Sequence, residues 1–129
     1  IPTPAEPIAD DMRTALTERQ TLIETAARRL LHDAQEARAA WVARLGQPSP
    51  RPEERERWEA HAATVALYRD RYEITGPAPL GDPHVVRSPD QAAEYRVGQL
   101  ALRQIKMIVR HDDERANQST VRTTPRRGL

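Results

Sequence analysis

The sequence contains no cysteine and no phenylalanine, and aromatic residues make up only 4% of its 129 positions. Without cysteine there are no disulfides and no thiolate metal ligands, which is typical of a reducing compartment. No apolar run approaches the roughly 20 residues that a membrane-spanning helix needs, and no signal peptide is visible. We therefore expect a cytoplasmic chain that makes no contact with a membrane.

The sequence also lacks an excess of charge of either sign, because its net charge is only +1. No global field draws the chain to nucleic acid, so any such attraction must be local. The hydrophobic fraction of 38% supports a modest core of Ala, Leu, Ile and Val. At this length we expect one domain. Because the chain opens on IPTPAEP without Met, we expect it to be a fragment of a longer protein.

Apolar residues recur at helical spacing in three stretches, and no stretch alternates as a strand would. The first expected helix covers residues 10–45 and stops at Gly46, although Thr17 to Gln20 could also restart it as a capping box. The second covers residues 52–73, with Pro52 in its first turn. The third covers residues 89–110, with Ser88 as N-cap and Gln91 closing a capping box.

The expected fold is therefore all-α, a three-helix up-down-up bundle (residues 10–111) with a long first helix. We expect residues 1–9 to form a proline-rich, extended N-terminal segment and residues 112–129 to form a disordered, arginine-containing C-terminal tail. The first helix is much longer than the other two at about 1.5 Å per residue. Its overhang must bend, fray or meet another chain or domain, and a homodimer through this helix is one expectation.

The stretch RWEAHAATVALYRDRYEI, residues 57–74, has two interpretations. Aromatic residues among arginines could stack single-stranded DNA, or they could be the buried face of one helix. On a helical wheel Trp58, Tyr68 and Tyr72 share a face with Val65, which favours burial. Arg69 lies in the same stripe, where it could cover an aromatic ring with Glu73 as its partner, or reach out to DNA.

No arrangement of residues indicates catalysis or a cofactor. The four histidines (His32, His61, His84 and His111) lie far apart without a metal-ligand spacing. There is no glycine-rich phosphate loop with a GK[ST] ending and no spacing typical of a Ser-His-Asp or Cys-His site. We expect no catalytic residue, no metal, no cofactor and no enzyme activity in this fragment.

Two sets of residues are candidates for partner contact. Leu67, Ile74, Tyr95, Leu102 and Val109 form narrow apolar stripes that an isolated bundle would leave exposed. Arg115, Arg122, Arg126 and Arg127 follow Glu114 without an intervening acid, so with Arg69 they are the candidate DNA contacts. Gly98, in the middle of the third helix, indicates a close approach by another helix.

Residues 39–81 carry a resemblance to a known family. They hold a Trp-hydrophobic-x-x-Leu-Gly ending (Trp41 to Gly46), a proline connector, Trp58, a Val-Ala-x-Tyr-Arg-Asp-x-Tyr run (Val65 to Tyr72) and a Pro-Leu-Gly loop (Pro79 to Gly81). This pattern resembles the C-terminal part of actinobacterial conjugative relaxases of the TrwC/TraI (MobF) type, over roughly residues 20–105. The sequence departs from it at Glu73, where the pattern has Gly before Ile.

Such relaxases nick plasmid DNA with a tyrosine and unwind it with an ATP-driven helicase, and none of those catalytic elements lies in this chain. The resemblance implies a non-catalytic accessory domain of a conjugative relaxase-helicase. Its partners would be type IV secretion components, through recruitment to the transfer machinery, or other domains of the parent protein, through packing. A DNA-contacting module of the same enzyme and an unrelated helical interaction domain remain the alternatives.

Overall fold

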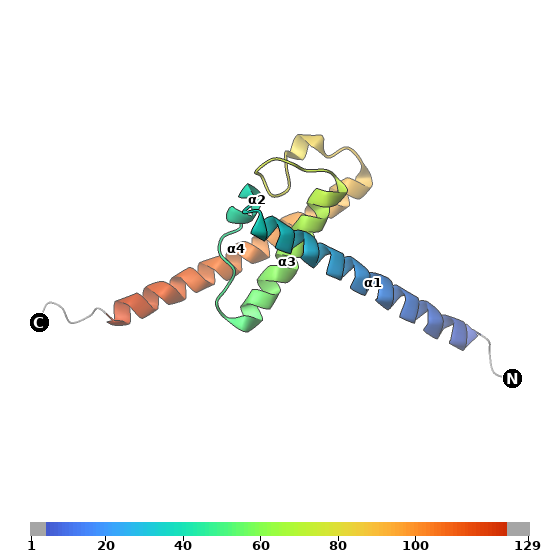
Figure 1. Cartoon of the computed structure of the whole chain (residues 1–129), viewed down its shortest axis with the longest axis horizontal. Coiled ribbons are helices and arrows are strands. Elements are labelled where there is room, and N and C mark those ends of the chain that lie inside the picture. The colour runs from blue at the N-terminus through green and yellow to red at the C-terminus, as the bar shows by residue number, and fades with distance from the viewer. Residues whose placement is uncertain (1–4, 124–129) are drawn as a thin grey trace, which may run out of the picture.

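The computed structural model describes residues 5–123, with side chains for residues 9–118. In these residues the fold is an all-α helical bundle, as predicted from the sequence, and it contains no strand. The elements are α1 (Ala5–Glu36), the short α2 (Ala40–Ala43), α3 (Pro52–Arg71), the 3₁₀ turn η1 (Pro83–Val85) and α4 (Pro89–Thr123). Figure 1 shows that the free halves of α1 and α4 leave the body in opposite directions.

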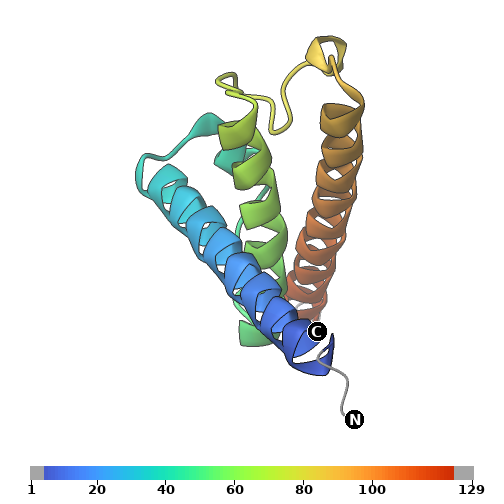
Figure 2. The ribbon, with the colours of Figure 1, turned by 90° about the vertical axis from the view of Figure 1, so that its right-hand side faces the viewer.

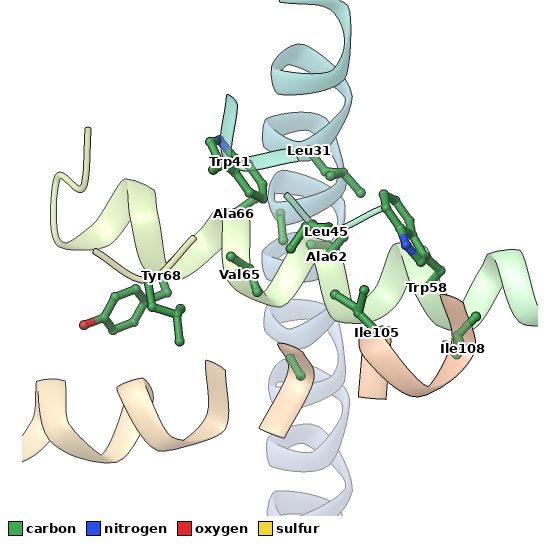
Figure 3. Packing of buried hydrophobic residues seen from close by; sticks show 14 residues of the cluster. Leu31, Trp41, Leu45, Trp58, Ala62, Val65, Ala66, Tyr68, Ile105 and Ile108 are labelled. Atoms are coloured by element: carbon green, nitrogen blue, oxygen red, sulfur yellow. The ribbon is translucent and has the colours of Figure 1, made fainter. Parts of the chain in front are cut away.

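Helix α3 is the central element, and both α1 and α4 pack against it. Its Trp58 and Val65 are fully buried, which agrees with the prediction that the stretch 57–74 is a core face. Figure 3 shows these side chains between Leu31 of α1, Trp41 of α2 and Ile105 of α4. The aromatic residues of this stretch are thus used for packing and are not available as a stacking platform.

The three long helices do not follow a simple up-down-up order. Helices α3 and α4 run antiparallel, whereas α1 crosses α3 at a steep angle (Figures 1 and 2). Between α2 and α3 the chain runs back along the body. Helix α3 therefore does not reverse the direction of α1, as an up-down-up order would require (Figure 2). Among the described side chains of α1, the buried ones are Ala27 and Leu31, both in its C-terminal half.

The first helix does not run unbroken to residue 45 as expected; it ends at Glu36, and α2 follows after a sharp turn. Arg38 adopts a positive φ of 54°. The amide of Ala39 donates to the carbonyl of Ala34, and that of Arg38 to Gln35, which is the hydrogen-bond pattern of a Schellman C-cap. The turn directs Trp41 and Leu45 into the core, where both are buried. Helix propensity alone could not reveal this break.

Helix α3 ends in the same way at a second non-glycine residue. Glu73 has a φ of 51°, and the amide of Ile74 donates to the carbonyl of Arg69 at 2.8 Å. The helix therefore stops at Arg71, two residues before the predicted end. Glu73 is the position at which the family pattern has Gly, and its left-handed backbone is the conformation that favours Gly.

The predicted helix starts of α3 and α4 are confirmed. Pro52 lies in the first turn of α3, with Glu53 and Glu54 beside the helix N-terminus. The hydroxyl of Ser88 accepts a hydrogen bond from the amide of Gln91 at 3.0 Å, as an N-cap does. The Gln91 side chain differs from a capping box, because its Oε1 accepts from the amide of Arg87 and its Nε2 donates to Tyr68.

Both outer ends are more helical than expected. Residues 112–123, predicted to be disordered, continue α4, and α1 already begins at Ala5, within the segment expected to be extended. No Gly or Pro interrupts residues 99–123, and extending an established helix costs far less than nucleating one. α1 also runs without a break through Thr17. Residues 1–4 and 124–129 of the predicted end segments lie outside the described residues.

The two left-handed residues give a direct test of this backbone. We expect Arg38→Gly and Glu73→Gly each to raise the free energy of unfolding by about 0.5–1 kcal/mol, because relief of the strain outweighs the extra entropy of an unfolded glycine. The same exchange at Ala60, an exposed position inside α3, should lower it by about 1 kcal/mol. Urea denaturation measures all three, and loss of stability at position 38 or 73 would contradict these C-caps.

Candidate functional site

The guanidinium of Arg69 is buried and bonded entirely within the chain. It donates to the carbonyl oxygens of Gly76 at 2.8 Å, Ala78 at 2.7 Å and Pro79 at 3.2 Å. Its Cζ lies 5.0 Å from the ring centroid of Trp41. Burial lowers the pKa of Arg69, which nevertheless remains a cation. The expected aromatic contact is present, but backbone carbonyls of the loop take the place of Glu73.

This arrangement removes Arg69 from the candidate DNA contacts. A guanidinium that donates three hydrogen bonds to loop carbonyls would have to abandon them to reach a phosphate. Its role is to hold the loop after α3 against the end of that helix. Leu80 follows directly in the loop and is buried.

Leu80 explains the glycine in the middle of α4. A Cβ placed on Gly98 would lie 2.7 Å from Cδ2 of Leu80. The close approach that Gly98 indicated is therefore real, but the approaching element is the loop after α3 and not another helix. This contact turns the Gly98 face of α4 toward the body.

As a result, α4 is rotated from its predicted orientation by about a quarter of a turn at 100° per residue. The face predicted from the apolar spacing held two residues that are buried, Ala101 and Ile108, and five that are not: Ala93, Val97, Leu100, Gln104 and Met107. The observed face is centred on Gly98, Ala101, Ile105 and Ile108, and Ile105, which the sequence reasoning missed, is only 1% exposed. The signal that could have found it is Gly98, which marks the side of α4 that is approached.

The rotation also changes the predicted partner surface. Leu67, Ile74, Tyr95, Leu102 and Val109 were expected to be exposed, and this expectation is wrong: all five are half-buried and pack against the core. Ile74 lies against the open side of Gly81, and Val109 against that of Gly46. The structure thus uses these residues first for its own packing.

Apart from Val85 of η1, which is 41% exposed, the large exposed apolar residues with described side chains lie in two places. In the projecting half of α1, residues 9–24, which we call the α1 arm, Met12, Leu16, Leu22 and Ile23 are 40% to 71% exposed. On α4, Val97, Leu100 and Met107 are 54% to 59% exposed; we call them the α4 outer stripe. The apolar stripe of α1 therefore continues along the arm, but among the described side chains only its C-terminal half packs against the body.

A set of basic residues lies beside the α4 outer stripe on the same helix. No acidic residue occurs from Tyr95 to His111. Four exposed basic residues within about 80° of the helix surface form what we call the α4 basic stripe: Arg96, Arg103, Lys106 and Arg110. None of them makes a hydrogen bond or ion pair with another side chain of residues 9–118. This stripe is the largest set of unpaired charge of one sign on the described part of α4.

Of the arginines predicted to contact DNA in the C-terminal region, the structure describes the side chain of one, Arg115. Arg115 is exposed and lies 3.0 Å from Nε2 of His111 through its Nη2. The backbone of Arg122 belongs to α4, while its side chain lies outside the described part of the chain. Arg126 and Arg127 lie entirely outside it.

Polar contacts between α3 and α4 form a cluster next to the α4 outer stripe. Glu94 accepts hydrogen bonds from Arg71, at 2.6 Å, and from the hydroxyl of Tyr72. The hydrogen bond to Glu94 is the main reason why the pKa of Tyr72 is raised. With the Gln91–Tyr68 bond, these contacts tie the end of α3 to the start of α4. A groove of about 180 Å³ beside them is lined by Thr64, Leu67 and Val97, among others.

The histidines do not converge. In the part of the chain with described side chains, no group of three or more His, Cys, Asp and Glu could hold a metal ion. His61 lies half-buried on α3, where burial, together with the neighbouring charge of Arg57, lowers its pKa. No helix among the described residues is long and apolar enough to cross a membrane.

Replacing Arg69 tests its structural role. We expect Arg69→Met to lower the free energy of unfolding by about 2–3 kcal/mol, because three loop carbonyls lose a charged donor. Arg71→Met, which breaks only the solvent-exposed pair with Glu94, should cost less than about 1 kcal/mol. Denaturation and limited proteolysis of residues 75–81 provide the measurements. Equal effects of the two variants would contradict the proposed role.

His61 predicts a dependence of stability on pH. Because its folded pKa lies below the unfolded value of 6.5, the unfolded chain binds this proton first, and stability falls as the pH drops below 6.5. His61→Gln should remove this part of the loss, whereas His32→Gln, at an exposed position, should not. Unfolding midpoints between pH 7.5 and about 5 decide the point, and an unchanged slope in His61→Gln would refute it.

Comparison with known proteins adds no relative. No protein-family model matches this chain, and neither a curated protein nor a solved structure matches it.

Proposed function

We propose that this chain is a non-catalytic helical domain that acts by binding another protein through the α1 arm, as an accessory domain of a conjugative relaxase-helicase. One observation carries the protein-binding part. The apolar stripe that packs against α3 at Ala27 and Leu31 continues outward along the arm through Ile23, Leu16 and Met12, where none of the side chains of residues 9–118 covers it.

An uncovered stripe of this kind is unfavourable for a helix on its own. Sixteen residues are near the length below which an isolated helix is marginal in water, and each exposed Leu, Ile or Met side chain would gain about 1.5–3 kcal/mol if fully buried. A partner helix that covered the stripe would supply both the burial and the helix stability. Protein contact is therefore the function that this geometry supports best.

The relaxase part of the proposal rests on residues 39–81 and on what they do in this fold. Trp41, Trp58, Tyr68 and Leu80 of the resembling segment are all buried core residues. Glu73, at the glycine position of the pattern, has the backbone conformation that glycine favours. The resembling residues are thus those that build the body, which supports a shared architecture and leaves the arm as the variable, partner-binding element.

Contact with DNA is the second candidate, and the unpaired α4 basic stripe is the observation that favours it. Its four cations extend over about 22 Å, from Arg96 to Arg110, at 1.5 Å per residue. Phosphate contacts of this number would give binding that weakens steeply with salt. Arg69 is buried and no longer a candidate DNA contact, so among the described side chains the α4 basic stripe and the exposed Arg115 support this second candidate.

Site-specific photo-crosslinking in the full-length protein in its host tests protein contact. A crosslinking amino acid at Leu16 should join the arm to a protein, whereas one at Thr14, which is exposed on the opposite side of the same turn, should not. If both positions yield no protein adduct, the proposed function is wrong. Mobility shifts of duplex and single-stranded DNA at several salt concentrations are the parallel test for the second candidate.

A further inference from the structure

We propose that the partner of the α1 arm is a second copy of this chain, whose α4 receives the arm on its outer and basic stripes. This inference rests on the proposed function and names the partner of the same arm. The two surfaces are both present in one molecule, yet each lacks a cover: the arm is 40% to 71% exposed at its apolar residues, and the α4 outer stripe is 54% to 59% exposed.

The two surfaces match in charge. The arm carries Asp11 and Glu18, both exposed and neither paired with another side chain of residues 9–118. They lie next to Leu22 on the helix surface, at the border of the apolar stripe. The α4 basic stripe holds the opposite charge in the same position, at the border of Leu100 and Met107. Unpaired acids beside one apolar stripe thus correspond to unpaired bases beside the other.

They also match in length and spacing. The arm is about 24 Å long and the basic stripe about 22 Å, at 1.5 Å per residue. Asp11 and Glu18 are seven residues apart, as are Arg103 and Arg110. The apolar residues repeat the same interval, with Leu16 and Ile23 on the arm and Leu100 and Met107 on α4. A shared seven-residue interval is the spacing at which two helices keep one pair of faces in contact.

The positions of the charges determine the direction of packing. Viewed along each helix from its N-terminus, the charged residues lie counterclockwise of the apolar stripe, on the arm as on α4, because residues advance clockwise by about 100° each. Two such faces bring their charged borders together only if the helices run antiparallel. That arrangement places Glu18 beside Arg103 and Asp11 beside Arg110, while Leu22 meets Leu100 and Ile23 meets Val97.

One residue of the arm does not fit the charge pattern. Arg19 lies between Leu22 and Met12 on the wheel, so it faces the partner from within the apolar surface. Its aliphatic stem can lie along that surface while the guanidinium reaches water.

When each of two copies donates its arm to the α4 of the other, the assembly is a closed, twofold-symmetric dimer.

The alternatives have weaker support. A pair of arms packed on each other would cover one apolar stripe but would leave the α4 outer and basic stripes unused. Nucleic acid would pair with the basic stripe but would leave Val97, Leu100 and Met107 in water. Among these arrangements, only the exchange of arms between two copies satisfies the acidic arm, both apolar stripes and the basic stripe together.

Sedimentation equilibrium of the purified chain with paired charge reversals tests the proposal. The unchanged chain should form dimers at or below about 100 µM, within the range of specific interfaces of modest size. Asp11→Lys/Glu18→Lys and Arg103→Glu/Arg110→Glu should each weaken self-association at least tenfold. An equimolar mixture of the two variants should regain the dimer, because each basic arm then meets an acidic α4 and each acidic arm a basic one.

Matched controls keep the interpretation specific. Asp33→Lys/Arg44→Glu reverses two exposed charges in the body and should leave self-association unchanged, and circular dichroism checks that every variant is folded. A chain that stays monomeric, an α4 reversal that still dimerises through its arms, or a mixture that is not restored would each overturn the proposal. So would DNA binding by a monomer that is lost in Arg103→Glu/Arg110→Glu.

The result also separates this inference from the proposed function. If the chain is monomeric but Leu16 crosslinks to a different polypeptide, the arm binds a protein and the second copy is the wrong partner. If the chain is monomeric and Leu16 crosslinks to no protein, both proposals fail.

Discussion

The hydrogen bonds of Arg69 to the loop after α3 are the interaction on which the rest of this structure depends. They hold the carbonyls of Gly76, Ala78 and Pro79 at the end of α3, with Trp41 stacked on the guanidinium. The loop then carries Leu80 into the body, where it meets Gly98 and sets the rotation of α4. That rotation decides which apolar residues of α4 are buried and which remain outside. A single buried cation thus links the core to the surface available for partners.

The same sequence of contacts explains how far the sequence could predict the fold. Helix starts depend on local chemistry, so Pro52 and Ser88 could be read correctly. The core face of α3 was also predictable, because Trp58 and Val65 share one side of a regular helix. The helix ends were harder, since Arg38 and Glu73 adopt left-handed conformations that only tertiary packing compensates. A pattern that looks for Gly or Pro cannot find such ends.

The sequence could predict that α4 has exposed apolar residues for a partner, but it could not predict which residues these are. Helix α4 has apolar residues on most of its circumference, so periodicity alone could not decide which arc faces α3. The wheel chose the arc around Val97 and Met107, whereas the loop and Gly98 select the arc around Ile105 and leave the other outside. Leu102 and Val109, expected on the surface, are consequently half-buried. The α4 basic stripe could not be predicted either, because only the folded structure shows which charged side chains are paired.

The two halves of α1 differ in what stabilises them, because one packs against the body and the other, the arm, is exposed. The body half is held by Ala27 and Leu31 against α3, so it remains helical whatever the arm does. The arm has no such contacts, and its helix is propagated from the body end at a small gain per residue. Binding of a partner therefore stabilises the helix of the arm. Loss of the partner lowers the stability of the arm and leaves that of the body unchanged. An element of this kind can gain and lose a partner without disturbing the core that Arg69 and Trp58 hold together.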